Sequence, residues 1–150
     1  MDEELPSLAE VHAKLDFSLG GDAHVARYEE TDGEVGYHWN DTTCLVLHTT
    51  GRRTGELRKF ALIFGARGDD FVVVASKGGA PEHPGWYRNL VAHPDAAVQV
   101  KGDVIPVRAR TATGAEREEL WQLMLGQWPY YADYAMRTDR EIPVVVLERR

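Results

Sequence analysis

Six short runs of apolar and β-branched residues constrain the fold of this chain more than any other feature. They cover residues 45–50, 57–66, 71–76, 96–101, 104–111 and 142–148. Several are joined by glycine-containing links of hairpin length, which is typical of antiparallel strands. This number of strands, with edges that must be covered, favours a small closed or split β-barrel with helices packed outside. The sequence therefore predicts an α+β protein, mainly β, with about six mostly antiparallel strands.

The N-terminal segment carries a helical pattern. Its apolar residues recur at spacings of three and four, which predicts an amphipathic helix over residues 8–19. This helix packs on the domain's own sheet or lies on a membrane surface. Its polar face favours packing on the sheet, because it carries two acidic residues, Glu10 and Asp16, and one basic residue, Lys14. A face with a net negative charge is repelled by anionic lipids.

Three further helices are predicted, one before the first strand and two between strands. Asp22 is a candidate N-cap for a helix over residues 23–30. Pro84 fits the first turn of a helix over residues 83–92. Thr113 and Glu116 match a capping box for a helix that ends near residue 126.

Length and composition indicate one domain. The 150 residues divide into an N-terminal helical lead, 1–21, and a barrel domain, 22–150. The net charge of −7 argues against nucleic-acid binding, which depends on cations that neutralise phosphates. Cys44 starts an apolar run, so we expect a buried, inert thiol rather than a nucleophile. The lone cysteine, and the lack of a signal peptide or membrane span, predict a cytoplasmic protein, with membrane association as the alternative.

A basic strip interrupts this acidic chain. Residues 52–88 hold seven Lys/Arg and four Asp/Glu, a local balance of +3. Such a strip suggests a small anionic ligand rather than a polyanion. Within it, the turn from Gly51 to Gly55 presents Arg52 and Arg53, whose guanidiniums can bind phosphate or carboxylate. The alternative is a charged hairpin tip that keeps a sheet edge soluble.

A second candidate anion site ends the third strand. Ser76 and Lys77 enter a Gly78-Gly79 loop, where exposed backbone N–H groups could hold a phosphate. The alternative is an ordinary strand exit with a solvated lysine. In the helix that follows, Trp86 is expected in the core, and Asn89 either binds a ligand or lies on the surface.

An aromatic segment follows the last predicted helix. Trp128, Tyr130, Tyr131 and Tyr134 fall within seven residues, and such rings can wall a planar organic substrate. The alternative is a helix-to-strand connection packed on the core. We predict no metal site, because the six histidines are scattered, and no hydrolytic triad. Binding residues without an evident nucleophile or metal suit a protein whose cofactor supplies the chemistry.

Four motifs in order carry a resemblance to a known family. They are Thr-Thr-Gly-Arg-Arg-Thr-Gly, Ala-Ser-Lys-Gly-Gly, His-Pro-x-Trp-Tyr-x-Asn-Leu and Trp-Pro-x-Tyr-x-Asp-Tyr. Over residues 22–150 the chain resembles the deazaflavin-dependent nitroreductase family. That resemblance implies an actinobacterial, flavin-reductase-like split barrel that binds the reduced 8-hydroxy-5-deazaflavin coenzyme F-420. Its members reduce quinones, and some activate nitroimidazole prodrugs.

The resemblance also implies residue roles. Arg52 and Arg53 would contact the phosphate and the acidic tail of the coenzyme, and Lys77 and Asn89 its phosphate and ribityl region. The expected contacts to the coenzyme also include Arg58, Phe60, Ala61, Val74, Ser76, Gly78 and Trp86. Trp128, Tyr131 and Tyr134 would wall the substrate side.

The implied reaction is hydride transfer to a quinone or related acceptor. Tyr131 or Tyr134 would hydrogen-bond the acceptor oxygen, and a tyrosine, Ser76 or water would supply the proton. The chain departs from the family at Phe60-Ala61, where Asn-Pro is common, and at Gly85, where a larger residue is frequent. Alternatives are a flavin mononucleotide reductase on the same fold and a non-catalytic deazaflavin carrier.

Overall fold

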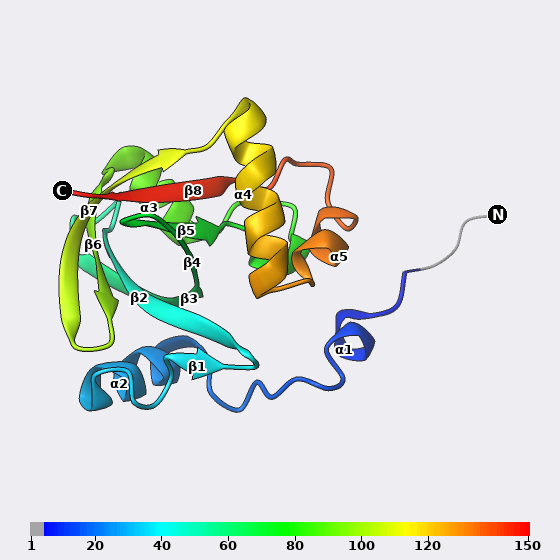
Figure 1. Ribbon diagram of the computed structural model, residues 1–150, viewed down its shortest axis with the longest axis horizontal. Coiled ribbons are helices and arrows are strands. Elements are labelled where there is room, and N and C mark those ends of the chain that lie inside the picture. The colour runs from blue at the N-terminus through cyan, green and yellow to red at the C-terminus, as the bar shows by residue number, and fades with distance from the viewer. Residues whose placement is uncertain (1–4) are drawn as a thin grey trace.

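The computed structural model describes residues 5–150, and its centre is one strongly curved antiparallel sheet (Figure 1). Residues 1–4 of the predicted N-terminal lead, 1–21, lie outside the described range. Along the sheet the strands follow the order β1-β2-β6-β7-β8-β5-β4, and β3 pairs with β2. The strands are β1 (His38–Trp39), β2 (Thr42–Thr50), β3 (Leu57–Ile63), β4 (Gly65–Arg67), β5 (Asp70–Val74), β6 (Asp95–Val100), β7 (Asp103–Thr111) and β8 (Val144–Arg149).

One bent stretch joins the two ends of this sheet. β3 pairs with β2, whereas β4, which follows it after Phe64, pairs with β5. At the bend, the Phe64 N–H donates to the carbonyl of Thr43 at 3.0 Å. The predicted barrel is therefore confirmed, but the predicted single strand over 57–66 is wrong, because the chain turns there from one partner to the other. The expected six strands become eight through this break and the two-residue β1.

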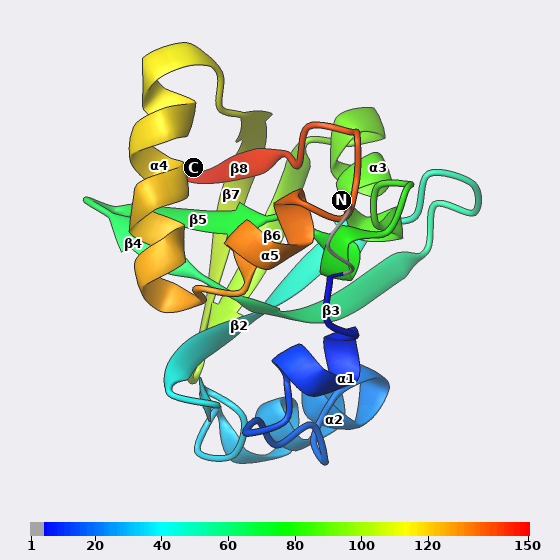
Figure 2. The same cartoon turned by 90° about the vertical axis from the view of Figure 1, so that its right-hand side faces the viewer.

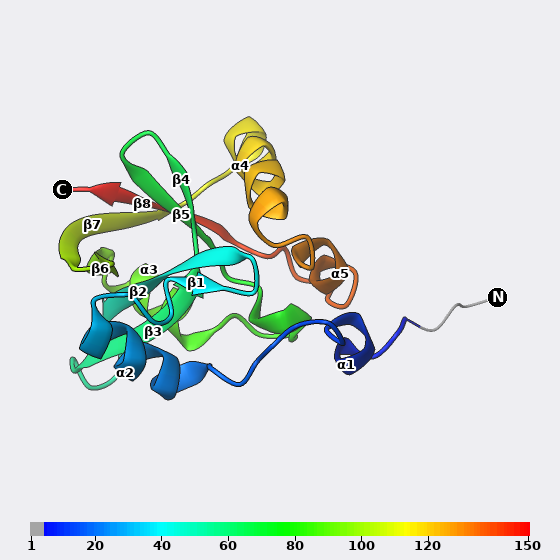
Figure 3. The ribbon, with the colours of Figure 1, turned by 60° about the horizontal axis from the view of Figure 1, so that its bottom comes forward.

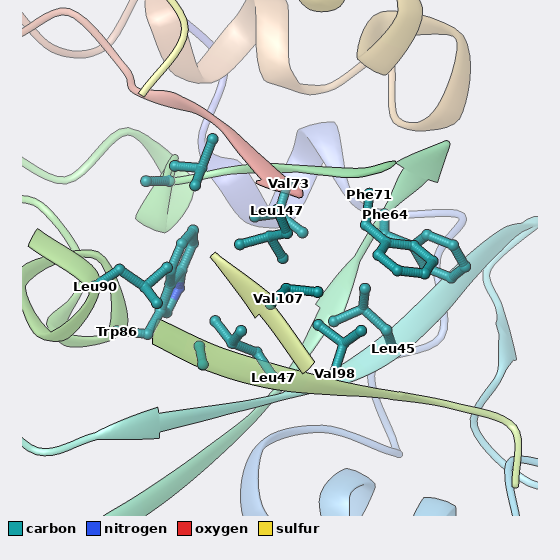
Figure 4. Close-up of a cluster of buried hydrophobic side chains, with 13 residues drawn as sticks. Leu45, Leu47, Phe64, Phe71, Val73, Trp86, Leu90, Val98, Val107 and Leu147 are labelled. Carbon is teal, nitrogen blue, oxygen red and sulfur yellow. The ribbon is translucent and has the colours of Figure 1, made fainter. Parts of the chain in front are cut away.

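The continuous apolar runs of the sequence reflect strands that are covered on both faces. Leu45 and Leu47 of β2 point into the barrel interior, where Leu147 of β8 also lies (Figure 4). Val46, between the first two, packs outward against the helix of residues 21–31. Val146 of β8 likewise faces the outer cluster. Alternate residues thus point into the interior core and into clusters outside the barrel, which leaves few polar positions in these strands.

The helices lie outside the barrel. Figure 1 shows α2 (Gly21–Thr31) below β2 and α4 (Gly114–Gln127) beside β5 and β8. The other helices are α1 (Leu8–Val11), η1 (Lys77–Gly79), α3 (Gly85–Ala92) and α5 (Tyr131–Ala135). No helix within residues 5–150 has the length and apolar character needed to cross a membrane.

The predicted N-terminal helix is much shorter than its periodicity suggested. α1 has four residues and starts with a capping box between Ser7 and Glu10. After this helix, a side chain of the barrel domain forms hydrogen bonds with the backbone N–H and carbonyl of the N-terminal segment. Asn40 accepts from the Asp16 N–H at 2.8 Å and donates to the Asp16 carbonyl at 2.7 Å. Residues 12–20 therefore form an irregular strap, because these contacts replace helical hydrogen bonds.

The predicted N-cap Asp22 and the predicted capping box of Thr113 with Glu116 are also wrong. α2 begins at Gly21, so Asp22 lies in its first turn and Gly20 is the N-cap. Thr113 is the N-cap of α4, but its side chain forms no capping hydrogen bond. Glu116 instead binds Arg110 at 2.5 Å and Arg67 at 2.6 Å. These hydrogen bonds, to Arg110 first, lower the pKa of Glu116 to about 2.

We expect Tyr28→Phe to lower the free energy of unfolding by about 2–3 kcal/mol. Tyr28 is fully buried, and its hydroxyl donates to the Cys44 carbonyl at 3.1 Å and accepts from the Lys101 N–H at 2.8 Å. Its removal would leave the buried Cys44 carbonyl and the Lys101 N–H without these partners. Urea unfolding measures the loss, with Tyr37→Phe as the control, because no hydrogen bond of the Tyr37 hydroxyl occurs within residues 5–150. Equal losses in the two variants would contradict this account.

Candidate active site

Two neighbouring hollows contain every residue to which the family resemblance assigns a role. The aromatic pocket, about 440 Å³, contains Ala61, Val74, Ser76, Lys77, Gly78, Trp86, Trp128, Tyr131 and Tyr134. The arginine pocket, about 270 Å³, contains Arg52, Arg53, Arg58, Phe60 and Asn89. Consecutive residues line the two pockets at two points: Phe60 and Ala61 on β3, and Pro84 and Gly85 at the start of α3. The two departures from the family pattern thus lie where the pockets adjoin.

The arginine pocket is formed by the turn between β2 and β3. The turn is closed by the Gly55 N–H, which donates to the Gly51 carbonyl at 2.8 Å. Arg53 is exposed, and Arg58 pairs only loosely with Glu56 at 3.4 Å. Arg52 is held against α3, as described next. Three guanidiniums therefore border one hollow, which can accept an anionic group with several charges.

Asn89 connects this turn to α3. Its side-chain oxygen accepts from the Arg52 backbone N–H at 3.2 Å and from the Arg52 guanidinium at 3.0 Å. Its amide nitrogen donates to the Thr49 hydroxyl at 3.1 Å. Asn89 is only 4% exposed, so the surface alternative is wrong. The residue positions Arg52, and its direct contact with a ligand stays a prediction.

The Lys77 loop borders the aromatic pocket with an unusual backbone. Lys77, Gly78 and Gly79 all have positive φ, at 46°, 62° and 82°. Arg140 holds the loop by donating to the carbonyls of Ala75, Ser76 and Ala80, at 3.1, 2.7 and 2.9 Å. No sequence motif indicated this role of Arg140. The loop therefore has a fixed shape, and the Lys77 ammonium lies 3.6 Å from Glu82.

The tyrosines of α5 form the opposite wall of the aromatic pocket. Tyr131 and Tyr134 are 4% and 6% exposed, and burial raises the pKa of both phenols. Tyr134 accepts a hydrogen bond from the Trp128 indole N–H at 3.2 Å. Its hydroxyl also bonds to Nε2 of His12 at 2.6 Å. Both phenols stay protonated at neutral pH, so they can donate hydrogen bonds.

Sequence reasoning missed the side of this pocket that comes from the N-terminal part of the chain. His12, Phe17, His24 and Trp39 line it together with the predicted residues. Figure 2 shows α1 and α5 on the same side of the barrel, and Figure 3 shows them as neighbours. Trp39 stacks on Trp128 with ring centroids 5.5 Å apart. Only a search for aromatic residues outside the four motifs could have indicated them.

Cys44 also borders the aromatic pocket, but its thiol is unreactive. It is 2% exposed, and burial raises the pKa of its thiol to about 12. The thiolate is the reactive form of cysteine, and it is scarce at neutral pH with such a pKa. The prediction of a buried, inert thiol is confirmed.

Comparisons with known proteins agree with the predicted resemblance. Residues 22–149 match the family model described as F420H(2)-dependent quinone reductase. The chain is 40% identical over 131 residues to the F420H(2)-dependent quinone reductase Rv1261c of Mycobacterium tuberculosis, covering 85% of this chain and 88% of that protein. A solved structure described as an F420-H2 dependent reductase, FDR-A, is 40% identical with a TM-score of 0.66, over 70% of this chain and 93% of that chain.

A second solved structure, described as a domain-swapped dimer, is 38% identical with a TM-score of 0.68. It covers 83% of this chain and 91% of that one. A putative pyridoxamine 5'-phosphate oxidase of Listeria innocua is only 11% identical with a TM-score of 0.51, so it shares the fold alone. With the model match and the 40% identity, the chain belongs to the F420H(2)-dependent quinone reductase family.

Proposed function

We propose that this protein transfers a hydride from the reduced deazaflavin coenzyme F-420 to a quinone or a related conjugated acceptor. The observation that carries the proposal is the adjacency of the two pockets. One is bordered by three guanidiniums, and the other is walled by apolar and aromatic side chains. Family membership supports the same reaction.

The residues that line the two pockets fit this coenzyme. A multiply anionic tail needs cations that are not already neutralised, and within residues 5–150 Arg53 takes part in no ion pair. A planar ring needs an apolar slot, which Val74, Ala61 and Trp86 provide beside the Lys77 loop. The volume of about 440 Å³ lies in the range of small-molecule sites. When bound, the coenzyme supplies the hydride.

The chain itself would supply orientation, shielding from water and a proton. Trp128 and Tyr131 wall the place for the acceptor with buried aromatic side chains, which would shield a bound acceptor from water. The Tyr134 hydroxyl can hydrogen-bond the acceptor oxygen, where negative charge develops, and then protonate it. Ser76 lines the same pocket as a second candidate donor. Its hydroxyl forms no hydrogen bond with the part of the chain from residue 5 onward.

Coenzyme binding followed by turnover tests the proposal. The purified protein is titrated with oxidised and reduced F-420, and with flavin mononucleotide side by side, while its fluorescence is followed. Menadione is then added, and oxidation of the reduced coenzyme is recorded. We expect saturable F-420 binding at micromolar concentration and turnover. Absence of binding would remove the proposal, preference for flavin mononucleotide would favour that reductase, and binding without turnover of any quinone or nitroimidazole would indicate a carrier.

Arg53→Ala is expected to weaken coenzyme binding on the order of tenfold, because one charge-assisted contact to the anionic tail is lost. Arg53 is exposed in the arginine pocket, so its removal leaves the fold intact. Arg27→Ala removes the same charge from the surface of α2, where Arg27 pairs with Glu30, and serves as the control. The dissociation constants are measured by fluorescence titration. Equal constants for the two variants would mean that Arg53 is a solvated surface residue.

A further inference from the structure

The hydrogen bonds of the Tyr134 hydroxyl determine what this phenol can do. A phenolic oxygen has one hydrogen to donate and can accept two hydrogen bonds. The Trp128 indole N–H is a donor only, so its bond at 3.2 Å occupies one acceptor position of Tyr134. The other hydrogen bond of this hydroxyl within residues 5–150 is with Nε2 of His12, at 2.6 Å. This second contact therefore decides where the phenolic hydrogen points.

His12 can take part in two ways. If Nε2 carries a hydrogen, it donates to Tyr134, and the phenolic hydrogen is left for an acceptor oxygen in the aromatic pocket. If Nε2 lacks a hydrogen, it accepts the phenolic hydrogen, and Tyr134 can donate nothing to the pocket. Only the first arrangement lets Tyr134 act as the acid of the proposed reaction. His12 and Tyr134 both line that pocket.

The surroundings of His12 suit the passage of a proton. Its ring lies edge-on to Phe17, Tyr130 and Tyr134, at centroid distances of 5.1 to 5.6 Å. The charged groups that face it are Asp133 of α5 and Arg137, two residues after the end of that helix, which pair with each other at 2.6 Å. Burial lowers the pKa of His12, Asp133 raises it, and Arg137 lowers it. The imidazole is therefore mainly neutral at pH 7, a state that can gain a proton at one nitrogen and lose one from the other.

We propose that His12 relays a proton to Tyr134 during reduction of the acceptor, an inference that rests on the proposed function. Hydride addition to a quinone leaves a hydroquinone monoanion, which needs one proton. The Tyr134 O–H bond breaks, and a new O–H bond forms on the hydroquinone oxygen. The resulting phenolate takes the proton from Nε2 of His12, and Nδ1 takes one from water. No protein group within residues 5–150 bonds to Nδ1, which leaves this nitrogen to solvent.

His12 is thus a positioning residue that acts through Tyr134. A purely structural reading makes His12 an anchor that ties the N-terminal strap to α5. That reading predicts that His12 variants change ligand affinity or stability. The relay predicts that they change the rate of protonation and leave affinity alone. Two measurements separate these outcomes, one without coenzyme and one with it.

The first measurement is ¹⁵N NMR of the histidine-labelled protein without coenzyme. The relay requires a direct bond between Nε2 of His12 and the phenol. We expect Tyr134→Phe to change the Nε2 shift and the apparent pKa of His12, and to leave those of His93, which is exposed after α3, unchanged. Insensitivity of the His12 signals to Tyr134→Phe would overturn the proposal whatever the activity of the enzyme.

The second measurement is menadione turnover by His12→Gln and His12→Ala, with His93→Gln as the matched control. We expect kcat to fall about tenfold in both His12 variants, because a positioned proton donor raises a rate by roughly a hundredfold or more and water replaces part of the relay. The coenzyme dissociation constant and KM stay within about twofold. Added imidazole partly restores the kcat of His12→Ala, and His12→Gln has little further effect in a Tyr134→Phe background.

Wild-type kcat in both His12 variants, or a loss confined to KM or coenzyme affinity, would overturn the relay. So would a loss of kcat in His12→Ala that imidazole leaves untouched. Failure of the proposed function would be seen in the wild-type protein itself, which would then neither bind the coenzyme nor reduce menadione. The two failures are thus distinguishable in the same series of assays.

Discussion

Tyr134→Phe is expected to lower kcat for quinone reduction about a hundredfold, with coenzyme affinity unchanged. The variant keeps the ring that walls the aromatic pocket and removes only the hydroxyl. That hydroxyl is the group we place against the acceptor oxygen, and a positioned general acid contributes roughly a hundredfold or more to a rate. Because the lost interaction strengthens as charge develops, the effect belongs in kcat rather than in KM.

Tyr130→Phe is the matched control for this prediction. Tyr130 precedes α5, is only partly buried and does not line the aromatic pocket. Steady-state oxidation of reduced F-420 by menadione measures both variants, and their thermal unfolding checks that the fold is kept. Equal kcat values for wild type and Tyr134→Phe would assign the proton to Ser76, Tyr131 or water instead.

Gly79→Ala is expected to lower the free energy of unfolding by about 2–5 kcal/mol. Gly79 has a φ of +82°, which costs a residue with a side chain roughly 1–2 kcal/mol. A Cβ there would lie 2.7 Å from the Tyr134 carbonyl oxygen and 3.1 Å from the Arg137 Cβ. Relief of that clash, which typically costs about 1–3 kcal/mol, requires the Lys77 loop and α5 to move apart. Turnover should fall as well, because the two walls of the aromatic pocket would separate.

Gly68→Ala provides the comparison that isolates the clash. Gly68 has a φ of +60° in the β4–β5 hairpin, and a Cβ there would meet nothing within 4 Å. This variant therefore carries the backbone cost alone, about 1–2 kcal/mol. Urea unfolding of both variants gives the difference between them. A Gly79→Ala protein no less stable than Gly68→Ala would show that the loop is free to move away from α5.

The strands could be predicted from the sequence because burial on both faces leaves a continuous apolar run. Val144 to Leu147 show this pattern, with alternate residues in the two cores. Closure of the barrel at Phe64 could not be predicted, because apolar residues continue through the bend while the pairing partner changes from β2 to β5. A local run of apolar residues indicates that a strand is buried. Which strand it pairs with depends on residues that are distant in sequence.

The candidate site likewise contains residues that could be predicted from the sequence and residues that could not. Its predicted members lie on short motifs whose residue types indicate the chemistry, such as the Arg52-Arg53 turn and the tyrosines of α5. His12 was hidden, because the spacing of Leu8, Val11 and Leu15 described a helix and gave no sign of a strap that reaches Tyr134. Glu116 is a second example, because it pairs with two arginines from β4 and β7 instead of forming the predicted capping box with Thr113.

The strap has a consequence for how the acceptor site can diversify. His12 and Phe17 wall the aromatic pocket, yet both lie outside the family-matched residues 22–149 and contribute to neither the barrel hydrogen bonds nor the interior cluster. A graft that exchanges this segment would redraw one face of the pocket and leave the interior cluster unchanged, although Leu8 and Leu15 of the same segment pack on the outer cluster. Under the proposed function, one wall of the acceptor site and the interior of the barrel are thus encoded in separable parts of one gene, and selection can act on the first with little effect on the second.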